Sequence, residues 1–113
     1  MIDQSIFADF TGGDKEFELD LISTFIDESI EYSALFTSNY AEGNLDELSK
    51  LSHKLKSSTD VFGLTNFRNM LFELEMGSKK ALNKEEITEQ YSTVIATFDD
   101  VIKEMKELKK SYS

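Results

Sequence analysis

The chain has 113 residues and a formal net charge of −10, because 22 acidic side chains outnumber 12 lysines and arginines. Its single histidine and its lack of cysteine exclude multi-histidine metal centres, thiolate zinc sites and disulfides, although carboxylate sites for Mg²⁺ or Ca²⁺ remain possible. The length predicts one domain over residues 1–113, and the 40% hydrophobic content is enough for a folded core.

A short helix and a long helix are predicted in the N-terminal third. The segment from Asp3 to Phe10 carries Ile6, Phe7 and Phe10, which favours a short helix that covers one end of the fold. Two glycines then precede Asp14, a good helix N-cap. The segment from Asp14 to Ala41 predicts a long amphipathic helix, because apolar residues recur there every four positions: Phe17, Leu21 and Phe25, and beside them Ile22, Ile26 and Ile30.

The next two predicted helices are joined by glycine. Gly43 is suited to end the long helix, and Asn44 with Glu47 has capping-box spacing for the third helix. That helix is expected to end at Gly63, which acts as a terminator, and a fourth helix follows. Their apolar stripes are Leu48, Leu51, Leu55 and Phe62, then Phe67, Met70, Leu71 and Leu74.

The last predicted helix begins with a second capping box, formed by Asn83 and Glu86. Its apolar residues follow steps of four and three, which leaves a dimeric coiled coil as an alternative. Four amphipathic helices joined by short turns instead favour an all-α monomer, an antiparallel four-helix bundle with the short N-terminal helix added. The stripe consists of Ile87, Tyr91, Val94, Phe98, Val101, Met105 and Leu108.

The only histidine, His53, falls on the side of the third helix opposite its apolar stripe, so its ring is expected to be exposed. Lys50, Lys54 and Lys56 surround it, and residues 49–59 contain no acid. Positive charge of this kind attracts phosphoryl groups and carboxylates. An ordinary solvated lysine face is the alternative.

One set of residues resembles the signature of histidine-containing phosphotransfer (HPt) domains, written here H-x-L-K-S-S-x4-G-x10-L-E. It consists of His53, Leu55, Lys56, Ser57, Ser58, Gly63, Leu74 and Glu75. The long N-terminal helix also resembles the helix that precedes the histidine helix in that family, through Asp14, Glu16, Phe17, Leu21, Ile22, Phe25 and Ile26. Ser57 departs from the pattern, because the family more often has glycine there. The resemblance implies a four-helix bundle and a phosphorelay.

In that relay, His53 would accept a phosphoryl group from an aspartyl phosphate on a receiver domain and pass it to another receiver. Imidazole titrates near neutrality, so an unprotonated, nucleophilic ring is available at cytoplasmic pH. Lys56 would offset the charge of the phosphoryl group, while Glu75 would orient the ring, pair with Lys56 or be a plain surface residue. The residues expected to contact the receiver are Ser49, Lys50, Ser57 and Asp60.

The chain has no G-x4-G-K-[ST] loop, which predicts a phosphoryl carrier without kinase activity of its own. We expect no cofactor in this chain, with Mg²⁺ supplied by the receiver, which belongs to a response regulator or a hybrid sensor histidine kinase. The acidic surface disfavours nucleic acid, and the lack of a leader or an apolar span predicts a cytoplasmic protein without membrane contact. The alternative is a helical module that binds a receiver without phosphotransfer.

Overall fold

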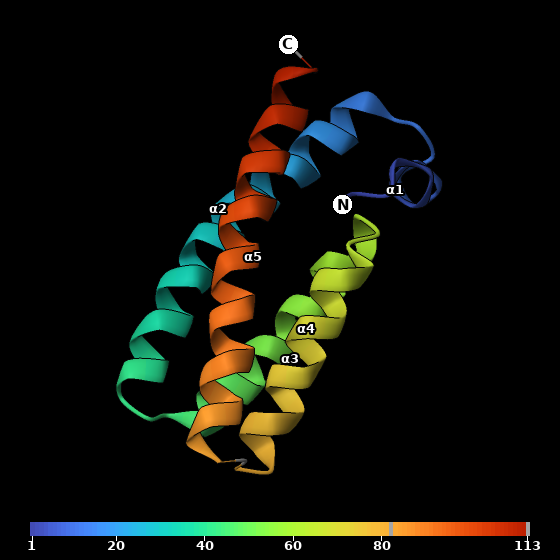
Figure 1. Ribbon diagram of the computed structural model, residues 1–113. Helices are drawn as coiled ribbons and strands as arrows, with labels where there is room; N and C mark the ends of the chain where they lie inside the picture. Colours follow the sequence, from blue (N-terminus) through green and yellow to red (C-terminus); the bar gives the residue numbers. More distant parts are fainter. Residues whose placement is uncertain (82, 113) are drawn as a thin grey trace.

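The computed structural model describes residues 1–81 and 83–112, in which helices joined by short turns form the whole fold and no strand occurs (Figure 1). The helices are α1 (Gln4–Thr11), α2 (Lys15–Ala41), α3 (Leu45–Val61), α4 (Thr65–Lys79) and α5 (Lys84–Lys110). Helices α2 to α5 run antiparallel in chain order; α3 packs on α2 and α4, and α5 packs on α4 and α2 (Figure 1). The predicted bundle with a short additional helix is therefore confirmed.

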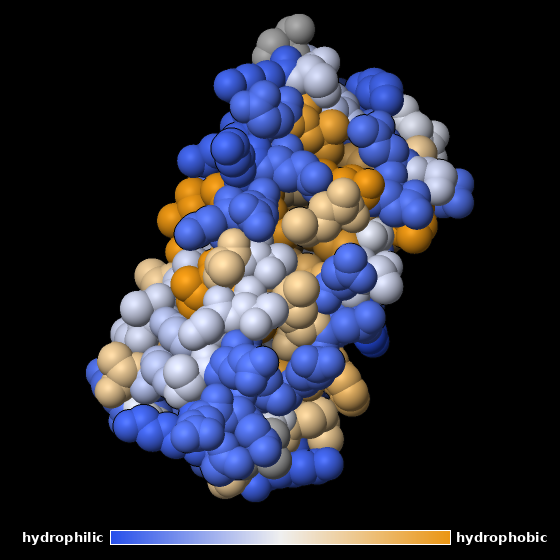
Figure 2. Space-filling view, viewed as in Figure 1, coloured by the Kyte–Doolittle hydropathy of each residue, from blue (hydrophilic) through white to orange (hydrophobic). Residues whose placement is uncertain are grey.

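The core of the bundle is aromatic at its centre. Phe98 of α5 meets Phe36 of α2 and Phe67 of α4 edge-on, with ring centroids 5.2 and 5.1 Å apart. The heptad stripe of α5 faces this core, since Ile87, Val94, Phe98, Val101 and Met105 are buried and Tyr91 and Leu108 are half-buried. On the face shown in Figure 2, hydrophilic residues predominate and hydrophobic ones form separate patches. The stripe that suggested a coiled coil is thus occupied within the chain.

The apolar stripes predicted for α2 extend beyond the residues that are buried. Exposure rises from 0% at Ile22 to 7% at Ile26 and 48% at Ile30, while Phe25 is buried and Phe17 is 42% exposed. Each four-residue step turns a helix by about 40° beyond one full turn, so a stripe at this spacing drifts off the buried face. Of the apolar residues of α1, Phe7 is buried, and Ile6 and Phe10 are exposed.

Two of the three predicted N-caps form. The side chain of Asp14 caps α2, and Asn83 caps α5 by accepting from the backbone N–H of Glu86 at 2.9 Å. The capping box predicted at Asn44 is wrong, because its side chain makes no cap hydrogen bond. Its Nδ2 donates instead to Asn39 Oδ1 at 3.1 Å, which ties the α2–α3 turn to the preceding helix.

The short helix α1 docks on the turn between α3 and α4. Phe62 stacks between Phe7 and Phe25 with centroids 4.7 and 4.8 Å apart, and its carbonyl accepts from the Asp3 N–H at 3.1 Å. Gly63 follows with φ of +65°, and a Cβ added there would lie 2.6 Å from the Cβ of Asp3. Gly63 therefore permits both the left-handed turn and the close approach of α1.

Gly63→Ala should lower the free energy of unfolding by about 2–3 kcal/mol, because backbone strain adds to a steric clash. Gly43→Ala is the matched control: the φ of Gly43 is +70°, but apart from Gly43 and its two chain neighbours no residue has an atom within 4 Å of an added Cβ. It should cost only the strain, about 1 kcal/mol. Urea unfolding at pH 7 measures both variants, and equal losses would contradict a tight contact between α1 and Gly63.

A buried carboxylate joins both ends of the chain at the same end of the bundle as the α3–α4 turn (Figure 1). Glu18 is 2% exposed and accepts hydrogen bonds from the hydroxyls of Thr11 and Tyr112, each at 2.6 Å. Lys15 Nζ lies 3.2 Å from the same carboxylate. The hydrogen bonds from Thr11 and Tyr112, with help from Lys15, lower the pKa of Glu18, while burial and this carboxylate raise the pKa of Tyr112 to about 12. Glu18 thus connects α1, α2 and the turn after α5.

Wild type should have a higher free energy of unfolding than Glu18→Gln at neutral pH. This difference between the two proteins should disappear in acid. Because the folded-state pKa of Glu18 lies below its ordinary value of 4.5, its contribution is fully present above that pH and is lost as the pH falls below it. Urea unfolding at several pH values tests this expectation. Glu16→Gln changes an exposed residue in the same helical turn and should unfold with nearly the wild-type free energy at every pH. A similar pH-dependent loss of stability in both variants would contradict the role of Glu18.

Candidate functional site

The site is built on the exposed side of α3. His53 is 69% exposed, whereas Leu51 and Leu55 on either side of it in sequence are buried against the core. The predicted outward position of the ring is therefore confirmed. Its location in the middle of a helix that packs on α2 and α4 gives the ring a rigid base while leaving it open to solvent.

A single carboxylate from α4 contacts both functional side chains predicted on α3. His53 Nδ1 lies 2.9 Å from Glu75 Oε2, and Lys56 Nζ lies 2.6 Å from Glu75 Oε1. The side chains of Lys56 and Glu75 are each only 13% exposed. The two roles considered for Glu75, orienting the ring and pairing with Lys56, are thus compatible in one conformation.

Local packing explains how Glu75 reaches this position. Leu74 is fully buried, and the next residue on a helix is turned by about 100°, which places Glu75 at the edge that faces α3. Ser49 Oγ donates to the backbone carbonyl of Glu75 at 3.1 Å and joins the two helices there. The carboxylate is therefore held by both α3 and α4.

The charge of Glu75 determines which nitrogen of the His53 ring carries a hydrogen. Burial disfavours the charged form of Glu75, but Lys56 and His53 outweigh it and hold the pKa of Glu75 below its ordinary value of 4.5. A carboxylate accepts hydrogen bonds and does not donate them, so the ring nitrogen that faces it carries the hydrogen. In the neutral form of the ring, Nε2 of His53 then has the free electron pair and faces away from Glu75.

The lysines that give positive charge near the histidine are not the set predicted from the sequence. Lys56 is not part of a free lysine face, because Glu75 neutralises it. Lys79 of α4 contributes instead, since it shares a shallow hollow with Lys50 and Lys54. This histidine hollow is lined by Asp46, Ser49, Lys50, His53, Lys54, Glu75 and Lys79. The spacing of four residues between Glu75 and Lys79 was the signal that could have indicated a shared face.

The predicted receiver-contact residues do not all lie in one place. Ser49 and Lys50 line the histidine hollow, whereas Ser57 is exposed on α3 outside it. Asp60, two turns from the histidine, pairs with Arg68 Nε of α4 at 2.9 Å. Phe72 of α4, which no sequence motif singles out, also lies beside the cluster, with its ring centre 4.9 Å from Lys56 Nζ.

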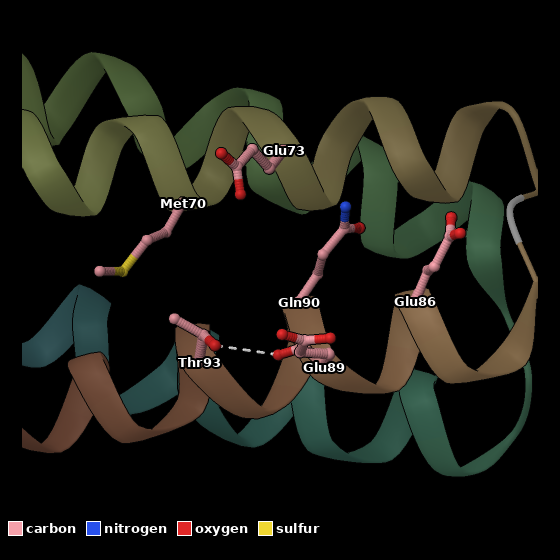
Figure 3. A pocket seen from close by; sticks show the side chains of 6 residues that line it. All are labelled: Met70, Glu73, Glu86, Glu89, Gln90 and Thr93. Atoms are coloured by element: carbon pink, nitrogen blue, oxygen red, sulfur yellow. Dashed lines mark hydrogen bonds between the residues drawn. The ribbon is translucent and has the colours of Figure 1, made fainter.

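A second hollow lies between α4 and α5 (Figure 3). It is lined by Met70, Glu73, Glu86, Glu89, Gln90 and Thr93, from both helices. Despite these carboxylates, no group of three or more potential metal-ligating side chains occurs among residues 1–81 and 83–112. Within the same residues, no helix has the length and apolar character needed to cross a membrane.

Comparison with known families agrees with this geometry. The family model of the Hpt domain matches residues 20–109, which include the whole His53, Lys56 and Glu75 cluster. No curated protein and no solved structure matches the chain significantly. Hpt domains are phosphocarriers rather than kinases, and they interact with receiver domains in the phosphorelays of two-component signalling. The match covers most of the chain, which therefore belongs to the Hpt domain family.

Proposed function

We propose that this chain is a phosphorelay intermediate that accepts a phosphoryl group on His53 from one receiver domain and passes it to another. The observation that carries the proposal is the shared carboxylate, which holds Nδ1 of an otherwise exposed ring at 2.9 Å. A histidine oriented in this way presents Nε2 to a partner surface. The family membership supports the same reaction class.

The transfer itself follows from the arrangement around the ring. Nε2 of His53 attacks the phosphorus of the aspartyl phosphate, the bond from phosphorus to the aspartate oxygen breaks, and the aspartate leaves as a carboxylate. The ring keeps its hydrogen on Nδ1 and so becomes positively charged. Glu75 stabilises that charge, because its carboxylate already lies against Nδ1.

Lys56 serves the phosphoryl group in this proposal. Its ammonium contacts the same Glu75 carboxylate as the His53 ring, with Nζ 2.6 Å from Oε1. The transferring oxygens carry negative charge, and a positioned cation favours both their approach and the bonded product. Lys56 is therefore the stabilising cation and Glu75 the group that places it.

The receiver would approach through the histidine hollow. Aspartyl phosphate chemistry requires an acidic, Mg²⁺-binding pocket, so the receiver carries the metal and this chain needs none. Lys50, Lys54 and Lys79 in the hollow complement such a pocket, although the chain as a whole has a net charge of −10. Ser57 and Asp60 would extend the contact along α3.

Incubation with a phosphorylated receiver tests the function. We expect radiolabelled phosphate to move to this chain in a form that is labile in acid and stable in base, as a phosphohistidine is. A second, unphosphorylated receiver should then remove it. Stable binding to receivers without any label on the chain would instead identify a binding module and overturn the proposal.

A further inference from the structure

Lys56 is enclosed on two sides by residues of α4. Its side chain is 13% exposed, with the Glu75 carboxylate 2.6 Å from Nζ and the centre of the Phe72 ring 4.9 Å from the same atom. That second distance lies within the range of an attractive contact between a cation and an aromatic face. The ammonium therefore has one anionic and one aromatic neighbour.

The core does not explain the position of Phe72. It is 46% exposed, and it takes part in none of the ring stacks in the described residues. It precedes Glu75 by three positions, so the two side chains share one face of α4. This face turns toward the exposed side of α3 and contacts Lys56 with both groups.

A lysine has a long and flexible side chain, and ordering it costs conformational entropy. An ion pair that water reaches freely is correspondingly weak. The ring of Phe72 acts against both effects: its attraction to the ammonium offsets the entropy cost of ordering Lys56, and its position over the ammonium limits the access of water to the ion pair. The location of Nζ relative to the histidine thus depends on the ring as well as on the carboxylate.

We infer that Phe72 is a positioning residue for phosphoryl chemistry at His53, acting by holding the Lys56 ammonium beside the Glu75 carboxylate. This inference rests on the proposed function. It assigns a role to a residue that contacts neither the ring nor the incoming phosphate.

Phosphoramidate is the probe, because it is a small donor that needs no docking surface. Nε2 of His53 bonds to phosphorus, the phosphorus–nitrogen bond breaks, and ammonia leaves. Phe72→Leu should reduce the labelling rate about two- to fivefold. Phe72→Tyr, which keeps the ring, should remain close to wild type. The matched control is Phe17→Leu, at a phenylalanine of similar exposure on α2 that should not affect labelling.

A double-mutant cycle separates positioning from a general structural effect. In a Lys56→Met background, Phe72→Leu should cause no further loss, because the ring then has no ammonium to hold. The NMR signal of the Lys56 Cε protons provides an independent readout, since Phe72→Leu should remove their ring-current shift. An unchanged rate in Phe72→Leu, or an equal loss with and without Lys56, would overturn the inference while leaving the proposed function intact. If neither phosphoramidate nor a phosphorylated receiver labels the wild-type histidine, the proposed function fails and the inference fails with it.

Discussion

His53→Gln is expected to abolish phosphoryl uptake, from a phosphorylated receiver and from phosphoramidate alike. Glutamine is polar and similar in reach, but it has no ring nitrogen with a free electron pair to attack phosphorus. The expected loss is at least about a hundredfold, to the background of the assay. Radiolabel incorporation followed by acid and base treatment measures it.

The fold provides a strong control for this variant. Because the His53 side chain is 69% exposed, the substitution should leave the helical content and the unfolding midpoint close to those of wild type. Loss of label in a folded protein then reports on chemistry. Label that persists in His53→Gln, or that is base-labile in wild type, would place the phosphate on another residue and contradict the assignment.

Glu75→Gln is expected to slow phosphoryl uptake about tenfold without abolishing it. The amide oxygen can still accept from Nδ1, but the negative charge that stabilises the positively charged ring and anchors Lys56 is removed. Initial rates with phosphoramidate at neutral pH measure the loss. Glu73→Gln, the same change two residues away on the other hollow of α4, is the matched control (Figure 3).

The titration of Glu75 tests the same electrostatic arrangement. Lys56 and His53 hold the pKa of Glu75 below its ordinary value of 4.5 against the opposing effect of burial, so the carboxylate is ionised at neutral pH. Removing the cation in Lys56→Met leaves the burial and should raise the pKa. The Cδ chemical shift of Glu75 reports both midpoints. Equal rates for Glu75→Gln and wild type, or a titration unaffected by Lys56→Met, would show that the carboxylate is a plain surface group.

Much of the scaffold was accessible from sequence because its causes are local. Four-residue periodicity placed the helices, and the angle between His53 and the Leu51 side of α3 predicted an exposed ring. The errors were also local in origin. The prediction of a stripe through Ile30 left out the rotation that accumulates with four-residue spacing. The cap predicted at Asn44 depended on a side-chain orientation that residue spacing does not determine.

The sequence by itself determined a helical chain with one exposed histidine, flanked by lysines and resembling the Hpt signature, because periodicity and motif spacing act over a few turns. Only the tertiary structure decided which charges meet. Glu75 lies 22 residues from His53 along the chain, and it reaches both the ring and Lys56 through the packing of α4 on α3. Lys79 joins the histidine hollow for the same reason. Contacts across two helices depend on their register and rotation, which residue spacing within one helix does not specify.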